Sequence, residues 1–167
     1  MLTQRPIDPK EDRDFILSLA CMGSYESVPV WYRDTSYRAY RESWFKSDFP
    51  SQVMNDLESS LSDPRTLVQI WSEDERKAGL LWLDFAESPQ GRTVATLRDM
   101  VVEPSHQRRG IGRLMLHAVE KAARENGAGV LRVETSVENE ATQKIYQKAG
   151  FTVARLMYEK VLDEASP

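Results

Sequence analysis

The sequence has little of what several classes of protein require. It contains one cysteine, Cys21, and two histidines, His106 and His117, so it cannot form an internal disulfide and has few ligands for a metal site. We therefore expect no bound metal, and a reducing compartment, the cytoplasm, as its location. The longest apolar runs, such as residues 78–83, fall far short of the roughly 20 residues that span a bilayer, and residues 1–10 lack the order of a signal peptide. No membrane association is expected.

A clustered basic surface is also missing. The formal net charge is -4, and the lysines and arginines are spread among acidic residues, which argues against a nucleic-acid partner. The chain has 167 residues, of which 41% are hydrophobic, and this length and composition suit one domain over residues 1–167 with one core.

Strand and helix patterns alternate along the chain. The segment 8–22 is expected to be a helix capped by Asp8. The periodic spacing of apolar residues from Ile111 to Ala122 predicts the clearest helix, which Asn126 and Gly127 end. This alternation indicates an α/β (α+β) fold with a mixed sheet covered by helices. The predicted strands are 2–7, 67–71, 78–85, 93–102, 130–135 and 151–161, and the other predicted helices are 52–61 and 139–149.

Residues 107–112, Gln-Arg-Arg-Gly-Ile-Gly, lie between the strand 93–102 and the start of that helix. Unpaired amides and the positive end of the helix dipole make such a position an anion site, and glycine lets a phosphate approach the backbone. The segment lacks the Gly-Lys-Ser/Thr of a P-loop and the third glycine of a dinucleotide fingerprint. Taken alone, it could also be a helix start with solvated arginines.

Two longer blocks give this loop a context. Residues 97–113, LRDMVVEPSHQRRGIGR, closely resemble motif A of the GNAT superfamily of N-acetyltransferases, and residues 139–151, NEATQKIYQKAGF, resemble its motif B. The resemblance implies a mostly antiparallel sheet of about six or seven strands with about four helices. It also implies acetyl-CoA binding by residues 93–151, and an acceptor pocket shaped by residues 23–62.

The resemblance further assigns cofactor contacts. Amides of the loop would hold the pyrophosphate, and the pantetheine arm would lie like an extra strand beside residues 100–102. Asn139 could equally be a plain helix N-cap. The residues assigned to the cofactor are Met100, Val101, Val102, Gln107, Arg108, Arg109, Gly110, Ile111, Gly112, Arg113 and Asn139.

The resemblance makes Tyr146 the proton donor to the departing thiolate, and simple packing beside Ile145 is the alternative interpretation. The general base is less constrained. Asp99 alternates with Leu97 and Val101, which would place a carboxylate on an apolar face where desolvation raises its pKa, unless a bulge alters the facing.

Other candidates are weaker. Glu26 lies in the acceptor-side segment, and Glu103 beside Pro104 is expected to face solvent. Cys21 has the sequence context of a core residue, and both histidines are expected on exposed positions. The aromatic group that could line an acceptor pocket or simply pack is Trp31, Tyr32, Tyr37, Tyr40 and Trp44.

The sequence thus predicts an acetyltransferase that acts through a ternary complex, with acetyl-CoA as acyl donor and a small-molecule or protein amine as acceptor. The alternative is a coenzyme A binding or sensing domain without transferase activity. A homodimer is a further expectation, because residues 23–62 could form an interface between subunits.

Overall fold

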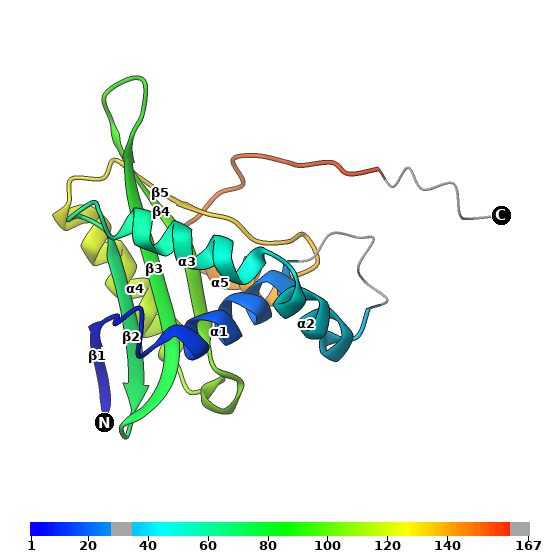
Figure 1. Ribbon diagram of the computed structural model, residues 1–167. Helices are drawn as coiled ribbons and strands as arrows, with labels where there is room; N and C mark the ends of the chain where they lie inside the picture. The colour runs from blue at the N-terminus through cyan, green and yellow to red at the C-terminus, as the bar shows by residue number, and fades with distance from the viewer. Residues whose placement is uncertain (28–34, 161–167) are drawn as a thin grey trace.

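A mixed sheet of five strands in chain order forms the centre of the computed structural model, which describes residues 1–27 and 35–160 (Figure 1). Neighbouring strands are antiparallel except the last pair, β4 and β5, which is parallel. The strands are β1 (Leu2–Pro6), β2 (Leu67–Glu73), β3 (Arg76–Glu87), β4 (Thr93–Val102) and β5 (Val130–Val133).

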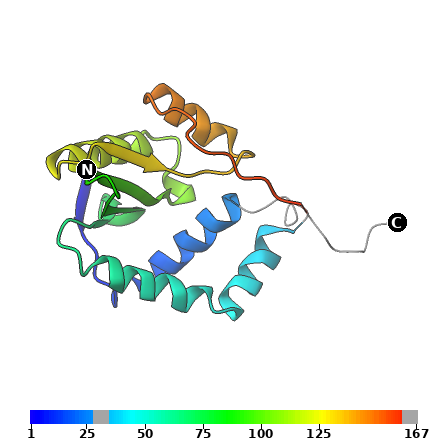
Figure 2. The same cartoon turned by 90° about the horizontal axis from the view of Figure 1, so that it is seen from above.

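Helices cover both faces of this sheet. The first three pack on one face and the last two lie on the other, as the view from above shows (Figure 2). A short 3₁₀ turn, Pro104–His106, follows β4. The α-helices are α1 (Arg13–Glu26), α2 (Tyr37–Lys46), α3 (Phe49–Ser60), α4 (Ile111–Glu125) and α5 (Glu140–Lys148).

The sheet separates two apolar cores. Leu80 and Val101 point toward the core under α1, whereas Leu81 and Leu97 point toward Met115 of α4. Side chains alternate between the two faces of a strand, so the continuous apolar run at the centre of β3 supplies both cores. The result is a three-layer arrangement with β3 and β4 at its centre.

The number of elements differs from the sequence prediction. The described residues form five strands instead of six or seven, and five α-helices instead of about four. The predicted last strand is wrong for residues 151–160, which have no regular structure and extend away from the sheet (Figure 1). They have no neighbouring strand, and a strand requires one to pair its backbone.

One helix prediction needs correction, and one helix was not predicted. The first helix begins at Arg13, because the Asp8 carboxylate accepts hydrogen bonds from the amides of Lys10 and Glu11 and closes a separate turn before it. The helix α2 has no clear periodicity in the sequence because Trp44 is its one buried residue. No helix in residues 1–27 and 35–160 is long and apolar enough to cross a membrane.

A β-bulge interrupts the pairing of β3 with β4. Trp82 pairs with Asp99 and Leu83 pairs with Leu97, so Arg98 is an extra residue without a partner across the ladder. The bulge reverses the facing of the second half of β4. The prediction that Asp99 shares a face with Leu97 is therefore wrong, and Asp99 instead faces α1 together with Val101.

The bulge also lies where β4 and β5 part. Their parallel pairing covers Val94 to Leu97 and pairs Leu97 with Val133, after which no further pair is formed among the described residues. The edge of β4 from residue 98 to residue 102 that faces away from β3 is thus left open. The open part of β4 is followed by the loop that leads into α4, and Gly23 of α1 lies beside Asp99 and Val101 there.

Candidate active site

The loop between β4 and α4 presents a row of free backbone donors. Among the described residues, the amides of residues 108–112 donate to no backbone carbonyl and to no side chain. Positive φ angles at Arg108 (63°) and Gly110 (84°) turn the chain sharply into the helix. Consecutive free amides at a helix N-terminus suit an anion such as a phosphate, the ligand that the sequence analysis expects here.

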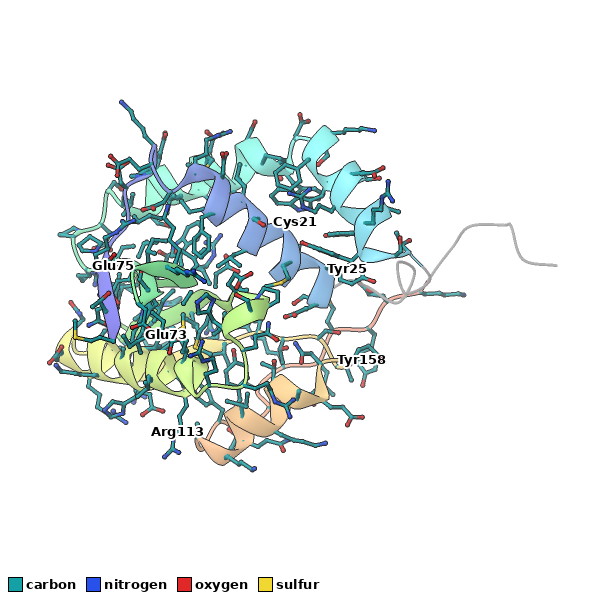
Figure 3. All side chains as sticks on the ribbon, turned by 90° about the horizontal axis from the view of Figure 1, so that it is seen from below. Cys21, Tyr25, Glu73, Glu75, Arg113 and Tyr158 are labelled. Atoms are coloured by element: carbon teal, nitrogen blue, oxygen red, sulfur yellow. The ribbon has the colours of Figure 1, made fainter. Side chains whose placement is uncertain are left out.

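Cations flank this loop unequally. Arg113 lines an open depression of about 460 Å³ with Gly110 and His117, and its side chain projects outward from α4 (Figure 3). Arg109 instead forms an ion pair with Glu73 at 2.7 Å, at the end of β2. Arg108 and Arg113 are therefore better placed than Arg109 to neutralise a bound phosphate.

The open edge of β4 offers backbone groups for an extended ligand. The amide of Glu103 donates to the Ala78 carbonyl on β3, so by strand alternation the backbone groups of Met100 and Val102 point the other way, into the opening. One of these backbone groups already has a partner within the protein: the Val102 carbonyl accepts a hydrogen bond of 3.0 Å from Gln107 Nε2. The amide and carbonyl of Met100 and the amide of Val102 remain for a ligand.

Asp99 lies beside this edge with α1 above it. A Cβ atom built on Gly23 of α1 would stand 3.6 Å from the Asp99 Oδ1 atom, so the helix backbone passes close to the carboxyl group. Burial raises the pKa of Asp99 to about 7, and the opposing charge of Arg98 is too weak to prevent the shift. A carboxylate half ionised near neutral pH and without a hydrogen-bond partner among the described residues is suited to accept a proton.

Motif B places its two candidates on α5. Tyr146 is half-buried, its ring lies 5.4 Å from that of Phe151, and burial raises the pKa of its hydroxyl, which keeps the proton on the phenol at neutral pH. The Asn139 side chain accepts a hydrogen bond from the Thr142 amide at 3.2 Å and so caps the helix. This is the N-cap alternative of the sequence analysis. The side-chain nitrogen of Asn139, Nδ2, is left for other contacts.

Three weaker candidates have structural explanations. The prediction of an exposed His106 is wrong, because the ring is buried and its Nδ1 lies 3.0 Å from both Glu103 and Ser105. Hydrogen bonds from Ser105 and His106 hold the pKa of Glu103 below its usual range, so Glu103 fastens the 3₁₀ turn and would be a poor base. Cys21 is fully buried in the α1 core, as predicted. His117 is exposed, also as predicted.

Glu26 and the aromatic group lie at the far end of α1. Burial raises the pKa of Glu26. The ring of Tyr25, which the sequence analysis left out of the candidate pocket group, lies 5.2 Å from the rings of both Tyr37 and Tyr40 in tilted contacts that join α1 to α2. Trp44 is buried, so packing explains these described members. Trp31 and Tyr32 lie outside the described residues.

An open strand edge that leads into an amide-lined loop, with a carboxylate of raised pKa beside it, is an arrangement that suits an acyltransferase. The sequence profile described as Acetyltransferase (GNAT) family matches residues 29–151. The chain therefore belongs to the GNAT family, whose acetyltransferases use acetyl-CoA. Within residues 1–27 and 35–160, no group of three or more metal-ligating side chains is present.

Individual relatives point the same way. The chain is 30% identical over 112 residues to the streptothricin acetyltransferase of Streptomyces lavendulae, a match that covers 67% of this chain and 57% of that protein. Across the curated relatives, the matched part is 42% to 57% of their own length.

Solved structures share the fold. A putative acetyl transferase from Pyrococcus furiosus superposes with a TM-score of 0.69 and 23% identity, over 97% of this chain and all of that one. The structure of AAC(6')-Iy in complex with the bisubstrate analogue CoA-S-monomethyl-acetylneamine has a TM-score of 0.63 and 18% identity, over 96% of this chain and 98% of that one.

Proposed function

We propose that this protein is an N-acetyltransferase that moves an acetyl group from acetyl-CoA to a primary amine by direct attack within a ternary complex. One observation carries the proposal: the open backbone edge of β4 leads directly into the free amides of residues 108–112. An extended thioester arm that ends in a pyrophosphate has the two chemistries that this edge and this loop would bind.

The donor fits the residues present. The pyrophosphate would accept from the amides that precede and begin α4, with Arg108 and Arg113 supplying positive charge. The pantetheine arm would pair with the free backbone groups of Met100 and Val102. Because backbone atoms make those bonds, the identity of the side chains along this edge would matter little.

The acceptor must lose a proton before it can attack, because an ammonium group has no free electron pair. Asp99, with its pKa near 7, would accept that proton. The amine nitrogen then forms a bond to the acetyl carbonyl carbon while the carbon–sulfur bond breaks. The departing sulfur takes a proton from the Tyr146 hydroxyl, and the second amine proton restores that hydroxyl through solvent. The products are an N-acetyl amide and coenzyme A, and no covalent enzyme intermediate is needed.

The acceptor is a small-molecule or protein amine that reaches the site from the side of residues 23–62. The relatives act on acceptors as different as streptothricin and an aminoglycoside by their names, so family membership alone does not choose among them.

The test is thiol release from acetyl-CoA across a panel of amines, run with wild type and Tyr146→Phe. Removal of a general acid should lower kcat about 100-fold on an amine that wild type acetylates. Tyr158→Phe is a matched control, because Tyr158 is 87% exposed in the segment after α5. Full turnover by Tyr146→Phe would reject its role as the acid.

Calorimetry with acetyl-CoA tests the donor site separately. Binding without thiol release from any amine would favour a coenzyme A binding or sensing domain. No association at millimolar ligand would reject the donor site itself, and the proposed function with it.

A further inference from the structure

We infer that Arg98, the extra residue of the β4 bulge, is a positioning residue that turns Asp99 toward α1 and favours its charged form. This inference rests on the proposed function, because it gives Arg98 a task in the proton transfer that Asp99 would perform. Neither the motif resemblance nor helical or strand periodicity assigns Arg98 any role. The role is inferred from the position of Arg98 in the bulge and from its contacts.

The bulge decides which face of the sheet Asp99 lies on. Before the bulge, Leu97 points into the α4 core, and by simple alternation Asp99 would follow it there. The bulge at Arg98 places Asp99 on the α1 side instead, next to the open edge of β4. A carboxylate on the α4 side would be buried against Met115 and could not meet an acceptor. Access of Asp99 to the acceptor therefore depends on the bulge.

Several groups hold the side chain of the bulged residue in place. The Arg98 guanidinium lies 3.2 Å from an Asp56 oxygen of α3, 3.4 Å from an Asp84 oxygen of β3, and 5.2 Å from the centre of the Trp82 ring. Three groups on two other elements thus fix one side chain. A single exposed ion pair would add little, but a network of this kind restricts the geometry.

Asp84 extends this network. It accepts a hydrogen bond from the Trp82 indole nitrogen at 2.9 Å and from the Ser60 hydroxyl at 3.0 Å. Trp82 is the residue that pairs with Asp99 across the bulge. The contacts of Arg98 therefore act on both sides of the bulge and join it to the end of α3.

Charge also links Arg98 to Asp99. Other charged groups lie on the neighbouring elements, among them Glu26 at the end of α1, Asp56 on α3 and Asp84 on β3. Burial is the main influence on the Asp99 carboxyl and favours its neutral form, and the charge that opposes it is that of Arg98. The acidic neighbours are partly neutralised by the same arginine, since Asp56 and Asp84 both pair with it.

The substitution Arg98→Met tests the role of the charge, because methionine keeps much of the length of the side chain but has no charge. Loss of one neighbouring positive charge should raise the pKa of Asp99 by about one unit. The acidic limb of the kcat/KM profile should move upward by the same amount, because the base must be ionised to work. Activity at pH 6.5 should fall about 10-fold, and most of it should return at pH 9.

Arg65→Met is a matched control. Arg65 also forms ion pairs with two carboxylates, Asp63 at 2.9 Å and Glu87 at 3.0 Å, and lies over the Phe85 ring at 6.0 Å. It is not among the influences on Asp99. Its loss should leave the pH profile unchanged. Arg98→Lys, which keeps the charge, should shift the limb by less than half as much as Arg98→Met.

An independent measurement does not require activity. The carboxyl carbon of Asp99, labelled with ¹³C and assigned by its absence in Asp99→Asn, reports the titration of this one group. A raised pKa in Arg98→Met but not in Arg65→Met would support the inference even if no acceptor were found. An Asp99 titration identical in wild type and Arg98→Met would overturn it, whatever the fate of the proposed function. Should Arg98→Met not fold, Arg98→Gln provides the same comparison.

Discussion

Two aspartates contact α1 at its opposite ends, and their surroundings could hardly differ more. Asp12, just before the helix, is fully buried and accepts two hydrogen bonds of 2.7 Å from Arg5, with Lys77 at 2.7 Å as well. Asp99, beneath Gly23 in the second half of the helix, has a single neighbouring cation and no hydrogen bond among the described residues. The carboxylate of Asp12 thus has hydrogen-bonding cations on both oxygens, whereas within residues 1–27 and 35–160 that of Asp99 has only the charge of Arg98 nearby.

The difference separates stability from function. Burial alone raises the pKa of a carboxyl, but hydrogen bonds from Arg5 and Lys77 hold the pKa of Asp12 well below its usual range. Its charge therefore stabilises the fold and fastens β1 and β3 to the start of α1. At Asp99 the charge of Arg98 opposes burial only in part, so the folded protein keeps a group that exchanges its proton near neutral pH. The protein retains an unfavourable charge where the proposed reaction needs one.

The largest expected effect is on the stabilising aspartate. Asp12→Ala should lower the free energy of unfolding by about 2 kcal/mol, because it removes a fully buried carboxylate that Arg5 and Lys77, both partly exposed, share. Chemical denaturation measures this directly. The control is Asp14→Ala, an exposed acid in the first turn of the same helix, which should cost less than about 1 kcal/mol. Equal losses from the two variants would show that Asp12 is not a special anchor.

The sign of the pH dependence follows from the lowered pKa. The contribution of Asp12 to stability is present above pH 4, where the unfolded chain is ionised, and is lost as the pH falls through the much lower pKa of the folded state. Wild type should therefore lose part of its advantage over Asp12→Ala in acid.

The next effect is kinetic. Asp99→Asn should lower kcat/KM about 100-fold near pH 7 on an amine that wild type acetylates, since asparagine cannot accept the proton. Rate should partly recover at high pH, where more of the acceptor is already uncharged. A pH profile unchanged from wild type would reject Asp99 as the base.

The same substitution should stabilise the protein. The raised pKa means that ionised Asp99 costs stability, and this cost grows as the pH rises from about 4 to about 7. Asp99→Asn should therefore gain about 1 kcal/mol at pH 8, a figure kept small because Asp99 is partly open to water, and nothing below pH 4. Thermal denaturation at the two pH values measures it. A loss of stability at pH 8 would show that Asp99 has a favourable partner.

The smallest effect tests the redundancy at Asp12. Lys77→Met should cost only about 0.5 to 1 kcal/mol, because Arg5 keeps both of its hydrogen bonds and Lys77 is itself 36% exposed. Urea denaturation beside Asp12→Ala gives the ratio. A cost equal to that of Asp12→Ala would mean that the lysine alone holds the carboxylate.

Local patterns predicted the parts of the fold that local interactions decide. The apolar periodicity of α4 and the β-branched run of β4 gave those elements within a residue of their observed ends. The prediction of a final strand was wrong for residues 151–160, because a strand forms only beside a second strand, and a local pattern carries no information about that partner. The helix α2 was missed because its packing rests on aromatic contacts to α1, such as Tyr25 with Tyr37, and hardly on periodicity.

The candidate site divides in the same way. Residues 107–112 were predicted because glycines before an amphipathic helix have a local meaning, and the free amides of the loop agree with it. The facing of Asp99 was wrong because one extra residue reverses alternation, and nothing in the composition of β4 marks Arg98 as that residue. The prediction of an exposed His106 was wrong because its ring nitrogen Nδ1 is hydrogen-bonded to Glu103 and Ser105, which keeps the ring buried although it lies in a loop.

The bulge fixes the register of β4 as well as its facing. If the ladder closed with Arg98 kept, every residue after it would shift by one along β3 and change sides. Val101 would leave the α1 core, Met100 would enter it, and the carboxyl group of Asp99 would face Met115. Keeping Arg98 out of the ladder therefore preserves the contents of two cores at once.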